Sequence, residues 1–399
     1  MTDRTLYFAV QTRLHRDTMG NIRTDFGYAR YEAWIPFLTG VTRIVVVSRV
    51  AADVRDSGAL VEGPGVAVMA IPYYRGPLSF VRKVLRLRKF LKENLTDEDA
   101  LYGARIPNLL GSLVQRRARN LGASFVAQVV GDPEDVLNAG VAGRVGRLLS
   151  ASARRAVARD VSRADAVIYV TRRTLQEKYP PSAAAPTLVR SNVELSSSSF
   201  SAAPRHYLSA LSGAPIRLVT AGTHDQLYKG HDVLIDAVVI LRQRGLDVRA
   251  TIVGGGKHHD DLIERARASG VGAAIQFTGH LASAEEVRKH IVNADIFVMP
   301  SRTEGLPRVL IEAMAGGIAC IGSRVGGIPE LLNERSLFES GSAMGLAALV
   351  EELAHDPERM TWMSKQQWDE AKVIAESYSG TAILGPFLRS VEPASRLGR

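Results

Sequence analysis

The stretch "ADIFVMPSRTEGLPRVLIEAMAGGIACIGS" (residues 294–323) carries the signals of a complete strand–helix–strand unit. It opens with an apolar run that ends at Pro300, and a second apolar run occupies residues 318–323. Between them, Pro307 suits the first turn of a helix, where a missing N–H costs nothing, and Gly316–Gly317 is a usual helix stop. Buried strands joined through a helix pair in parallel. The stretch therefore predicts one βαβ unit of a parallel sheet.

The same alternation of short β-branched runs and longer helical patterns fills both halves of the chain. In the first half, strands are predicted at residues 6–10, 43–49, 66–71, 100–104, 125–130 and 166–170, with helices at 109–120 and 146–163. In the second half, strands are predicted at residues 216–222, 249–256, 274–280, 294–300 and 318–323. The predicted fold class is α/β, with two Rossmann-like domains facing across a cleft where a ligand would bind.

A segment rich in Ser, Ala and Pro at residues 196–214 is typical of a linker and predicts a hinge. We place an N-terminal domain at residues 1–200 and a C-terminal domain at residues 201–378. Residues 379–399 are predicted to form a helix or tail that returns to the first domain.

The composition is that of a globular protein: 399 residues, 46% hydrophobic and 23% charged. A single cysteine, Cys320, excludes a disulfide framework and fits a reducing compartment. The first residues contain only a short apolar run, so we expect no signal peptide. No stretch approaches the roughly 18 apolar residues of a membrane span. We therefore expect a cytoplasmic protein.

The net charge of +9 is unevenly distributed. Residues 1–200 hold 29 Lys or Arg against 18 Asp or Glu, whereas the remaining residues hold 21 against 23. A basic first half favours an anionic partner, such as a membrane surface. The alternative is an arginine-rich surface of the kind common in proteins from high-GC bacteria.

Two acids stand out in the opening stretch, Glu304 and Glu312. The pattern puts Glu304 on the loop after a strand, where ligands bind, and Glu312 inside the helix. The free amides of Gly305 and Leu306 would point out of the helix N-terminus, which favours negative charge. Carboxylates accept hydrogen bonds from vicinal hydroxyls, and a helix end binds phosphate. The alternative is a capping acid at Glu304 and a solvated helix residue at Glu312.

With its glutamates at these positions, "EGLPRVLIEAMAGG", followed by "IGSRVGGIPELL", resembles the retaining glycosyltransferases of family 4, which have the two-domain GT-B fold. The resemblance implies that Glu304 binds hydroxyls of the donor sugar with the backbone of Gly305 and Leu306, and that Glu312 binds the nucleotide ribose. The neighbouring Pro307 and Arg308 belong to the same implied donor site. It also makes the second domain the nucleotide-sugar domain and the first the acceptor domain.

A second segment, "TAGTHDQLYKGHDVLIDAV" (220–238), resembles the phosphate-binding segment of that family. Lys229 precedes a helix and can meet a diphosphate as a point charge; the alternative is a solvated loop lysine. The family usually has an arginine shortly after Gly222, and here Thr223 and His224 follow. A second cation would then come from elsewhere, and the candidates are Arg302, Arg308 and Arg105.

Two further loops are implied in donor binding. "VGGG" (253–256) lacks the dinucleotide-binding spacing, but in this family such glycines, Gly254 among them, let the chain pass close to the nucleotide. "FTGHL" (277–281) resembles the segment that touches the base, so His280 and Leu281 are candidates; His280 is equally well explained as a loop histidine.

The first domain matches the family mainly in its strand–helix rhythm. Where many members carry a histidine near the reacting sugar, this chain has Gly131–Asp132. Asp132 is a candidate for sugar or acceptor contact, with a turn-forming role as the alternative.

The implied reaction moves a hexose-type sugar from a UDP- or GDP-sugar to an acceptor hydroxyl with retention of configuration. The catalytic candidates are Glu304, Lys229 and Asp132, with no protein nucleophile, metal or other cofactor expected. The leaving diphosphate can accept the acceptor's proton, while Lys229 and the helix N-terminus stabilise its charge.

The acceptor is predicted from the first domain. Residues 79–95 form an amphipathic pattern, with Phe80, Val84, Leu87, Leu91 and Leu95 on one face and Arg82, Arg86 and Lys89 opposite. This pattern fits an element at the inner face of the cell membrane, or an ordinary core-packed helix. We favour a lipid-linked, exopolysaccharide or cell-envelope glycan. A soluble small-molecule acceptor and a GT-B sugar-nucleotide epimerase remain alternatives. Nucleic acid is disfavoured because only 6% of residues are aromatic.

Overall fold

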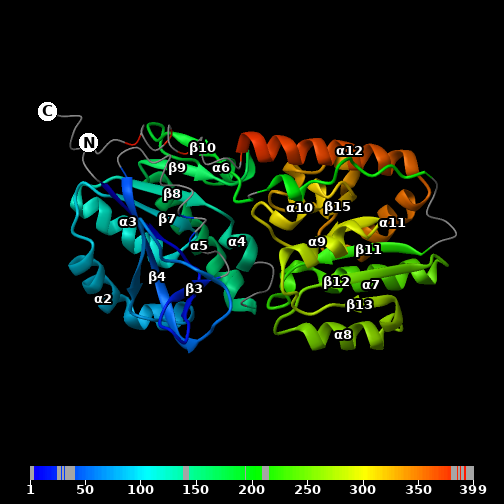
Figure 1. Cartoon of the computed structure of the whole chain (residues 1–399), viewed down its shortest axis with the longest axis horizontal. Helices are drawn as coiled ribbons and strands as arrows, with labels where there is room; N and C mark the ends of the chain where they lie inside the picture. Colours follow the sequence, from blue (N-terminus) through cyan, green and yellow to red (C-terminus); the bar gives the residue numbers. More distant parts are fainter. Residues whose placement is uncertain are drawn as a thin grey trace. The chain divides into compact units, whose positions relative to one another are not determined.

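The computed structural model describes residues 4–24, 28, 31, 41–137, 143–193, 195–208, 215–378, 384, 387 and 391. Its contacts divide the chain into two compact units (Figure 1). The first contains Met1–Val130, Arg155–Arg190 and Gly380–Arg399, and the second contains Gly131–Arg154 and Ser191–Ser379. The domain boundaries drawn from the sequence stay a prediction.

The second unit is built on a six-stranded parallel sheet in the order β13-β12-β11-β14-β15-β16. The strands are β11 (Ile216–Ala221), β12 (Val248–Val253), β13 (Ile275–Phe277), β14 (Ile296–Met299), β15 (Ala319–Ser323) and β16 (Leu337–Phe338). The strand order reverses between β11 and β14. In an open α/β sheet, a ligand binds beyond the carboxyl ends of the strands at such a reversal.

Helices cover both faces of this sheet. One core contains α7 (His231–Gln243), α8 (His259–Ala268) and α11 (Ala343–Ala354); the other contains α9 (Ala284–Val292), α10 (Arg308–Ala315) and part of α12 (Pro357–Val373). Successive side chains of a strand point to opposite faces of the sheet. Ile296 and Val298 of β14 therefore lie in the first core, and Phe297 and Met299 lie in the second.

The strand–helix–strand unit predicted for residues 294–323 is present as β14, α10 and β15. The helix begins one residue later than predicted, because Pro307 has extended backbone angles and caps α10 from outside. Gly316 ends the helix, and Gly317 follows in the left-handed region with φ of +72°. Both Rossmann-like domains of the predicted GT-B fold are present.

The described part of the predicted linker packs within the second unit. In residues 195–208, the backbone N–H of Ser201 donates to Ala315 O at 3.0 Å, and that of Arg205 donates to Gly317 O at 2.8 Å. The Arg205 guanidinium donates to the carbonyls of Val292 and Ala294. Ser, Ala and Pro mark irregular backbone, and these hydrogen bonds hold it in place over residues 195–208. The hinge predicted near residues 196–214 stays a prediction, and residues 209–214 lie outside the described residues.

The first unit has a parallel sheet in the order β10-β9-β8-β7-β1-β4, with β6 also paired to β4. Its strands are β1 (Arg4–Ala9), β4 (Val41–Val54), β6 (Val66–Ile71), β7 (Leu101–Ile106), β8 (Phe125–Val129), β9 (Ala166–Tyr169) and β10 (Thr187–Val189). The six predicted strands are confirmed. Short β2 (Leu14–Arg16), β3 (Ile22–Thr24), β5 (Ala59–Leu60) and β10 were not predicted, because two or three residues show no periodicity.

Residues 76–178 contain the helices α2 (Gly76–Asn94), α3 (Leu109–Leu121), α4 (Pro133–Val136), α5 (Gly143–Ser162) and α6 (Thr174–Lys178). Helix α4 and the first part of α5 belong to the second unit. The predicted helices 109–120 and 146–163 are therefore confirmed as α3 and α5. Of the predicted C-terminal tail, only Leu384, Phe387 and Val391 are described, and they pack in the core beside β1 and β4.

Helix α2 buries the apolar face that the sequence singled out. Phe80, Leu87, Leu91 and Leu95 are buried, at 0–6% exposure, and Val84 is half-buried. That face is therefore part of the core, which favours the core-packed reading. A second apolar strip, which the sequence analysis missed, is exposed instead: Leu78, Val81 and Leu85 are 79%, 65% and 74% exposed. Its spacing of three and four residues puts these three side chains on one face of α2.

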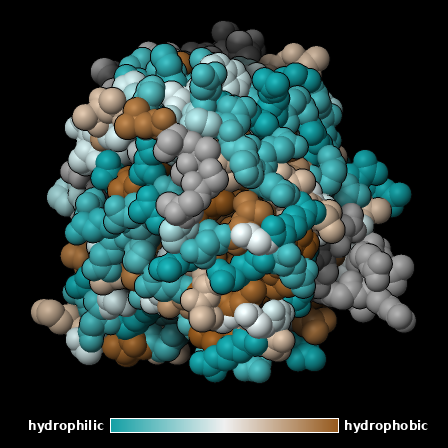
Figure 2. Space-filling view, turned by 90° about the vertical axis from the view of Figure 1, so that its right-hand side faces the viewer, coloured by the Kyte–Doolittle hydropathy of each residue, from teal (hydrophilic) through white to brown (hydrophobic). Residues whose placement is uncertain are grey.

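The surface in Figure 2 is mostly hydrophilic, and apolar side chains show through near its middle. In the described parts of the chain, no helix is long and apolar enough to cross a membrane.

Candidate functional site

Two loops meet at the strand reversal of the second sheet, one after β11 and one after β14. Lys229 lies in a 3₁₀ turn (Leu227–Lys229) of the first loop, and Glu304 lies in the second. The Lys229 Nζ donates to Glu304 Oε1 at 2.7 Å, and the Ser301 hydroxyl donates to the same oxygen at 2.7 Å. Their side chains are only 18% and 9% exposed. The structure thus joins the two strongest sequence candidates into one ion pair.

A glycine allows the Lys229 loop to come this close. Gly230 has φ of +72°, in the left-handed region, and a Cβ there would lie 1.9 Å from the carbonyl oxygen of Pro300 at the end of β14. Only glycine fits without moving one of the two chains. Gly230 therefore sets the spacing between the Lys229 loop and the Glu304 loop.

A second glycine holds Glu304 from the other side. Gly326 has φ of +51°, and a Cβ there would lie 1.8 Å from the carbonyl oxygen of Glu304. The next residue, Gly327, donates its backbone N–H to Gly305 O at 2.8 Å. The Ser323 hydroxyl donates to Ser301 O. The segment after β15 therefore positions the Glu304 loop, which explains why "RVGG" follows the two-glutamate motif.

Helix α10 starts directly after this loop. No hydrogen bond from the backbone N–H groups of Gly305 or Leu306 is found within the described residues, so both groups remain available to an anion at the helix N-terminus. Glu312 is exposed on α10, and its carboxylate makes no hydrogen bond with the described part of the chain. Nearby protein atoms still raise its pKa by desolvation, and Arg308 acts in the opposite direction. An accessible carboxylate in crowded surroundings suits a hydroxyl ligand.

Gly222, which follows β11, and Gly254, which follows β12, bring their backbones into direct contact. Gly254 has φ of +127°, and a Cβ there would lie 2.0 Å from Gly222 O. A Cβ on Gly222 would meet the Lys229 side chain at 3.6 Å. Thr223 donates its hydroxyl to Asp225 Oδ2 at 3.0 Å. Thr223 therefore orders a turn beside the lysine.

A histidine group lies behind this turn and was not predicted. His224 is fully buried, its Nδ1 is 3.0 Å from His259 Nδ1, and its ring meets His231 edge to face at 4.6 Å. Burial lowers the pKa of His224 to about 4 and that of His231 to about 3, so both are neutral at pH 7. The histidine rings therefore pack beneath the loop that follows β11. In the described parts of the chain, no group of three or more side chains could hold a metal ion.

The two residues predicted to touch the base lie beside this group. His280 is exposed and packs over Gly255, where an added Cβ would lie 2.8 Å from the histidine ring. Leu281 is half-buried against the core that contains α10. The loop is held to the β12 end by the Gly254 N–H, which donates to Gly279 O at 3.2 Å. Both residues are therefore at the strand ends, and their contact with a base stays a prediction.

Arg302, a candidate for the second cation, forms an ion pair with Asp232. Its guanidinium forms a two-point ion pair with Asp232, at 2.8 and 2.7 Å, and also donates to Leu227 O at 3.0 Å. The Asp232 carboxylate raises the pKa of Arg302. Arg302 therefore ties the two loops together, and its positive charge is already balanced. Arg308 is exposed on the first turn of α10.

Asp132 follows β8 and has a clear structural task. Its Oδ1 accepts the backbone N–H of Glu134 at 2.8 Å, which caps α4, and the residue is 6% exposed. This geometry favours the turn-forming alternative for Asp132. A catalytic role for Asp132 stays a prediction.

The chain is similar to several known proteins in sequence or in fold. Residues 218–368 match the model of the family described as glycosyl transferases group 1. Protein CapJ of Staphylococcus aureus is 25% identical over 324 residues, which cover 80% of this chain and 79% of that protein.

Two more similarities concern a mannosyltransferase and a solved structure. The GDP-mannose-dependent alpha-(1-6)-phosphatidylinositol monomannoside mannosyltransferase of Mycobacterium tuberculosis (strain CDC 1551 / Oshkosh) is 34% identical over 178 residues, 42% of this chain and 46% of that enzyme. The structure of Anabaena Alr3699/HepE in complex with UDP-glucose has a TM-score of 0.61 at 18% identity and covers 97% of this chain and 99% of that one. The second similarity concerns the fold.

Proposed function

Because this chain belongs to the glycosyl transferases of group 1, the retaining family-4 enzymes of GT-B fold, we propose that it transfers a hexose-type sugar from a UDP- or GDP-sugar to a lipid-linked or cell-envelope glycan. The chain is a glycosyltransferase that uses a nucleotide-sugar donor. The observation that carries the site assignment is the Lys229–Glu304 pair at the reversal of the second sheet.

In this proposal Lys229 binds the donor diphosphate. The Lys229 ammonium is paired with Glu304 Oε1. A diphosphate brings two or more negative charges to the same ammonium and to the Gly305 and Leu306 amides, where the α10 dipole also favours an anion. The pair keeps Lys229 ordered until the donor arrives, which lowers the entropy cost of binding.

Glu304 and Glu312 bind hydroxyls. Both hydrogen bonds that the structure gives to the Glu304 carboxylate reach Oε1, and Oε2 accepts none from the described residues. We assign Oε2 to a donor-sugar hydroxyl and the exposed Glu312 carboxylate to the ribose. Two acids fixed on one loop–helix segment would orient both ends of the donor.

The chemistry then needs no nucleophile from the protein. The acceptor hydroxyl attacks the anomeric carbon on the face from which the diphosphate leaves, and its proton goes to the departing phosphate oxygen. Lys229 and the α10 N-terminus stabilise the negative charge that builds up on the diphosphate. Arg302 is paired with Asp232, and Arg308 in the first turn of α10 stays a candidate for a second cation.

For the donor, the names of similar proteins support either nucleotide: GDP-mannose for the mannosyltransferase and UDP-glucose for the HepE complex. For the acceptor, the mannosyltransferase is named for phosphatidylinositol monomannoside. The excess positive charge of residues 1–200 and the exposed apolar strip on α2 support an acceptor presented at an anionic membrane.

Thermal unfolding with a panel of UDP-, GDP-, ADP- and TDP-sugars tests the proposal. A ligand at about 100 times its Kd adds roughly 2.7 kcal/mol to the free energy of unfolding, which gives a readable rise in Tm. The rise should occur with a UDP- or GDP-sugar and shrink in Lys229→Ala and in Glu312→Ala. Lys365→Ala, which removes an exposed lysine paired with Asp369, is the matched control. No rise with any sugar nucleotide contradicts the proposal.

A further inference from the structure

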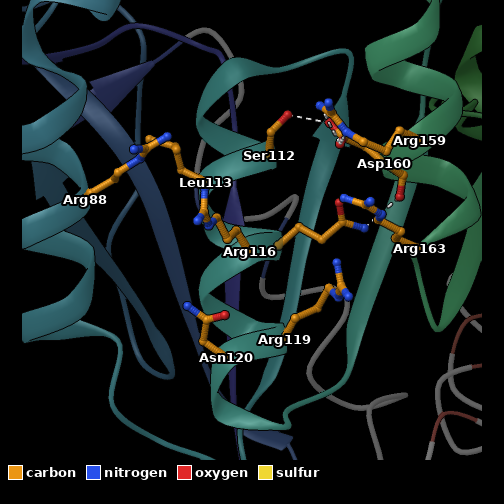
Figure 3. Close-up of a pocket in the computed structure, with 10 residues that line it drawn as sticks. Arg88, Ser112, Leu113, Arg116, Arg119, Asn120, Arg159, Asp160 and Arg163 are labelled. Carbon is orange, nitrogen blue, oxygen red and sulfur yellow. Dashed lines mark hydrogen bonds and ion pairs between the residues drawn. The ribbon is translucent and has the colours of Figure 1, made fainter.

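The first unit contains a cavity of about 560 Å³ between α2, α3 and α5. In Figure 3, Arg88 reaches in from α2 on one side and Arg159 and Arg163 lie on the side of α5, with Arg116 and Arg119 on α3 between them. The volume lies within the roughly 300–1,000 Å³ of small-molecule sites and exceeds what one water or simple ion needs.

The charges around the cavity are unbalanced. Asp160 is the only acid in its lining, and that carboxylate is already engaged by the Ser112 hydroxyl and by Arg159 at 3.4 Å. No ion pair or hydrogen bond joins the guanidinium groups of the other four arginines to any group in the described parts of the chain; these are Arg88, Arg116, Arg119 and Arg163. Four cations share one hollow, so an anion that enters it is attracted by all of them.

The cavity is not at the catalytic edge of its own sheet. Helix α3 starts after the carboxyl end of β7 and runs back to β8, so Arg116 and Arg119 in its last two turns lie near the amino ends of the strands. Arg159 and Arg163 lie at the end of α5, just before β9 begins. Because α/β sheets bind reacting ligands at the carboxyl ends, this cavity has a separate purpose.

The lining selects a phosphoryl group. A planar guanidinium donates two parallel hydrogen bonds to phosphate oxygens, and several arginines around one hollow are suited to a doubly charged anion. The Asn120 amide and the Ser112 hydroxyl add neutral polar groups, and the lining has no aromatic residue on which a nucleobase could stack. A second hollow of about 310 Å³ shares Arg88 and Arg116 and adds Lys92 and Arg117.

We propose that this arginine-lined cavity binds the phosphoryl group of an anionic ligand. The inference does not depend on the transfer reaction. A phospholipid headgroup and a free phosphorylated compound share this chemistry. Arg88 continues the line of Leu78, Val81 and Leu85 along α2 at a spacing of three, four and three residues, so an apolar strip leads towards the cavity.

Two binding measurements on the full chain test the proposal and separate the two sources. The free-ligand arm titrates inorganic pyrophosphate by calorimetry in a Lys229→Ala background, which removes the proposed donor diphosphate site. The lipid arm co-sediments the chain with vesicles of phosphatidylcholine containing anionic phosphatidylglycerol, at low and high salt.

The first test variant is Arg116→Gln/Arg119→Gln, which removes the two cavity arginines of α3. The second is Arg88→Gln/Arg163→Gln, which removes one arginine on α2 and one directly after α5. The matched control is Arg267→Gln/Lys289→Gln, which removes two exposed charges from the second unit. Either cavity variant should weaken binding at least tenfold in one arm, while the control changes it less than threefold. Loss with vesicles identifies a lipid headgroup, and loss with pyrophosphate alone identifies a free phosphorylated ligand. Binding that is absent, unchanged in both cavity variants, or equally reduced by the control overturns the proposal.

Discussion

Replacing Gly230 by alanine tests whether the contact between two loops sets the position of Lys229. A Cβ at residue 230 would lie 1.9 Å from Pro300 O, whereas ordinary contacts begin at 3.4 Å, so the loops must part by about 1.5 Å. Overpacking of this kind costs about 1–3 kcal/mol. The left-handed conformation costs an alanine about 1–2 kcal/mol more. We expect Gly230→Ala to lower the free energy of unfolding by about 2–5 kcal/mol.

Gly270→Ala is the matched control. Gly270 also has a left-handed backbone, with φ of +75°, but no heavy atom lies within 4 Å of its added Cβ. In Gly270→Ala, the free energy of unfolding should therefore fall only by the about 1–2 kcal/mol that a left-handed backbone costs an alanine. In thermal unfolding a unit of this size loses about 2–4 °C of Tm per kcal/mol, so Gly230→Ala should melt at least ~2–4 °C below Gly270→Ala.

The same samples report on the site. Parting the two loops moves Lys229 away from Glu304, so the Tm rise on adding the nucleotide sugar should shrink in Gly230→Ala and persist in Gly270→Ala. If both variants melt together and keep the full ligand response, the close contact does not position Lys229 and the reasoning is refuted.

Three further outcomes follow from the same contacts. Lys229→Ala should weaken nucleotide-sugar binding about 10–150-fold in calorimetry, since a hydrogen bond to a charged group contributes about 1.5–3 kcal/mol; an unchanged Kd would remove Lys229 from the site. The pKa values of His224 and His231, about 4 and about 3, lie below 6.5, so the unfolded chain binds more protons in acid. Lowering the pH from 7 to 5 should therefore reduce the free energy of unfolding by about 2 kcal/mol per histidine, and a His224→Gln variant that keeps the whole acid sensitivity would contradict this. Arg302→Met leaves the Asp232 carboxylate without its two-point partner and should cost about 1–3 kcal/mol, most of it recovered by adding Asp232→Asn; no recovery would mean that the arginine acts through other contacts.

The sequence was most informative where local signals agree with one another. In residues 294–323, the apolar runs, Pro307 and the glycine pair all predict the same strand–helix–strand unit, and β14, α10 and β15 are present. Glu304 stands out because it follows a strand end, where ligands generally bind in open α/β sheets. The roles of Glu304 and Glu312 came from the resemblance to family 4. Lys229 was predicted from its place just before a helix and from the resemblance of residues 220–238 to the phosphate-binding segment of family 4.

Sequence reasoning could not decide which face of a helix is buried, because this depends on the elements that pack against it. An amphipathic pattern in α2 shows that one face is apolar, but the packing decided that this face is buried and that Leu78 and Val81 are exposed. In the same way, the composition of residues 196–214 does not show that the carbonyls of Val292 and Ala294 accept hydrogen bonds from Arg205.

By itself, the sequence determined the alternation of strands and helices, the two α/β halves, the excess of positive charge in residues 1–200 and the residues at the strand ends. These are local properties, set by the period of apolar residues and by the conformational limits of proline and glycine. Only the tertiary structure decided that Lys229 pairs with Glu304 and that Asp232 neutralises Arg302. It also decided that five arginines, four on helices α2, α3 and α5 and one directly after α5, line one cavity. Such pairings join residues far apart in the chain, and their distances depend on how helices and loops pack against the sheet, which no local pattern encodes.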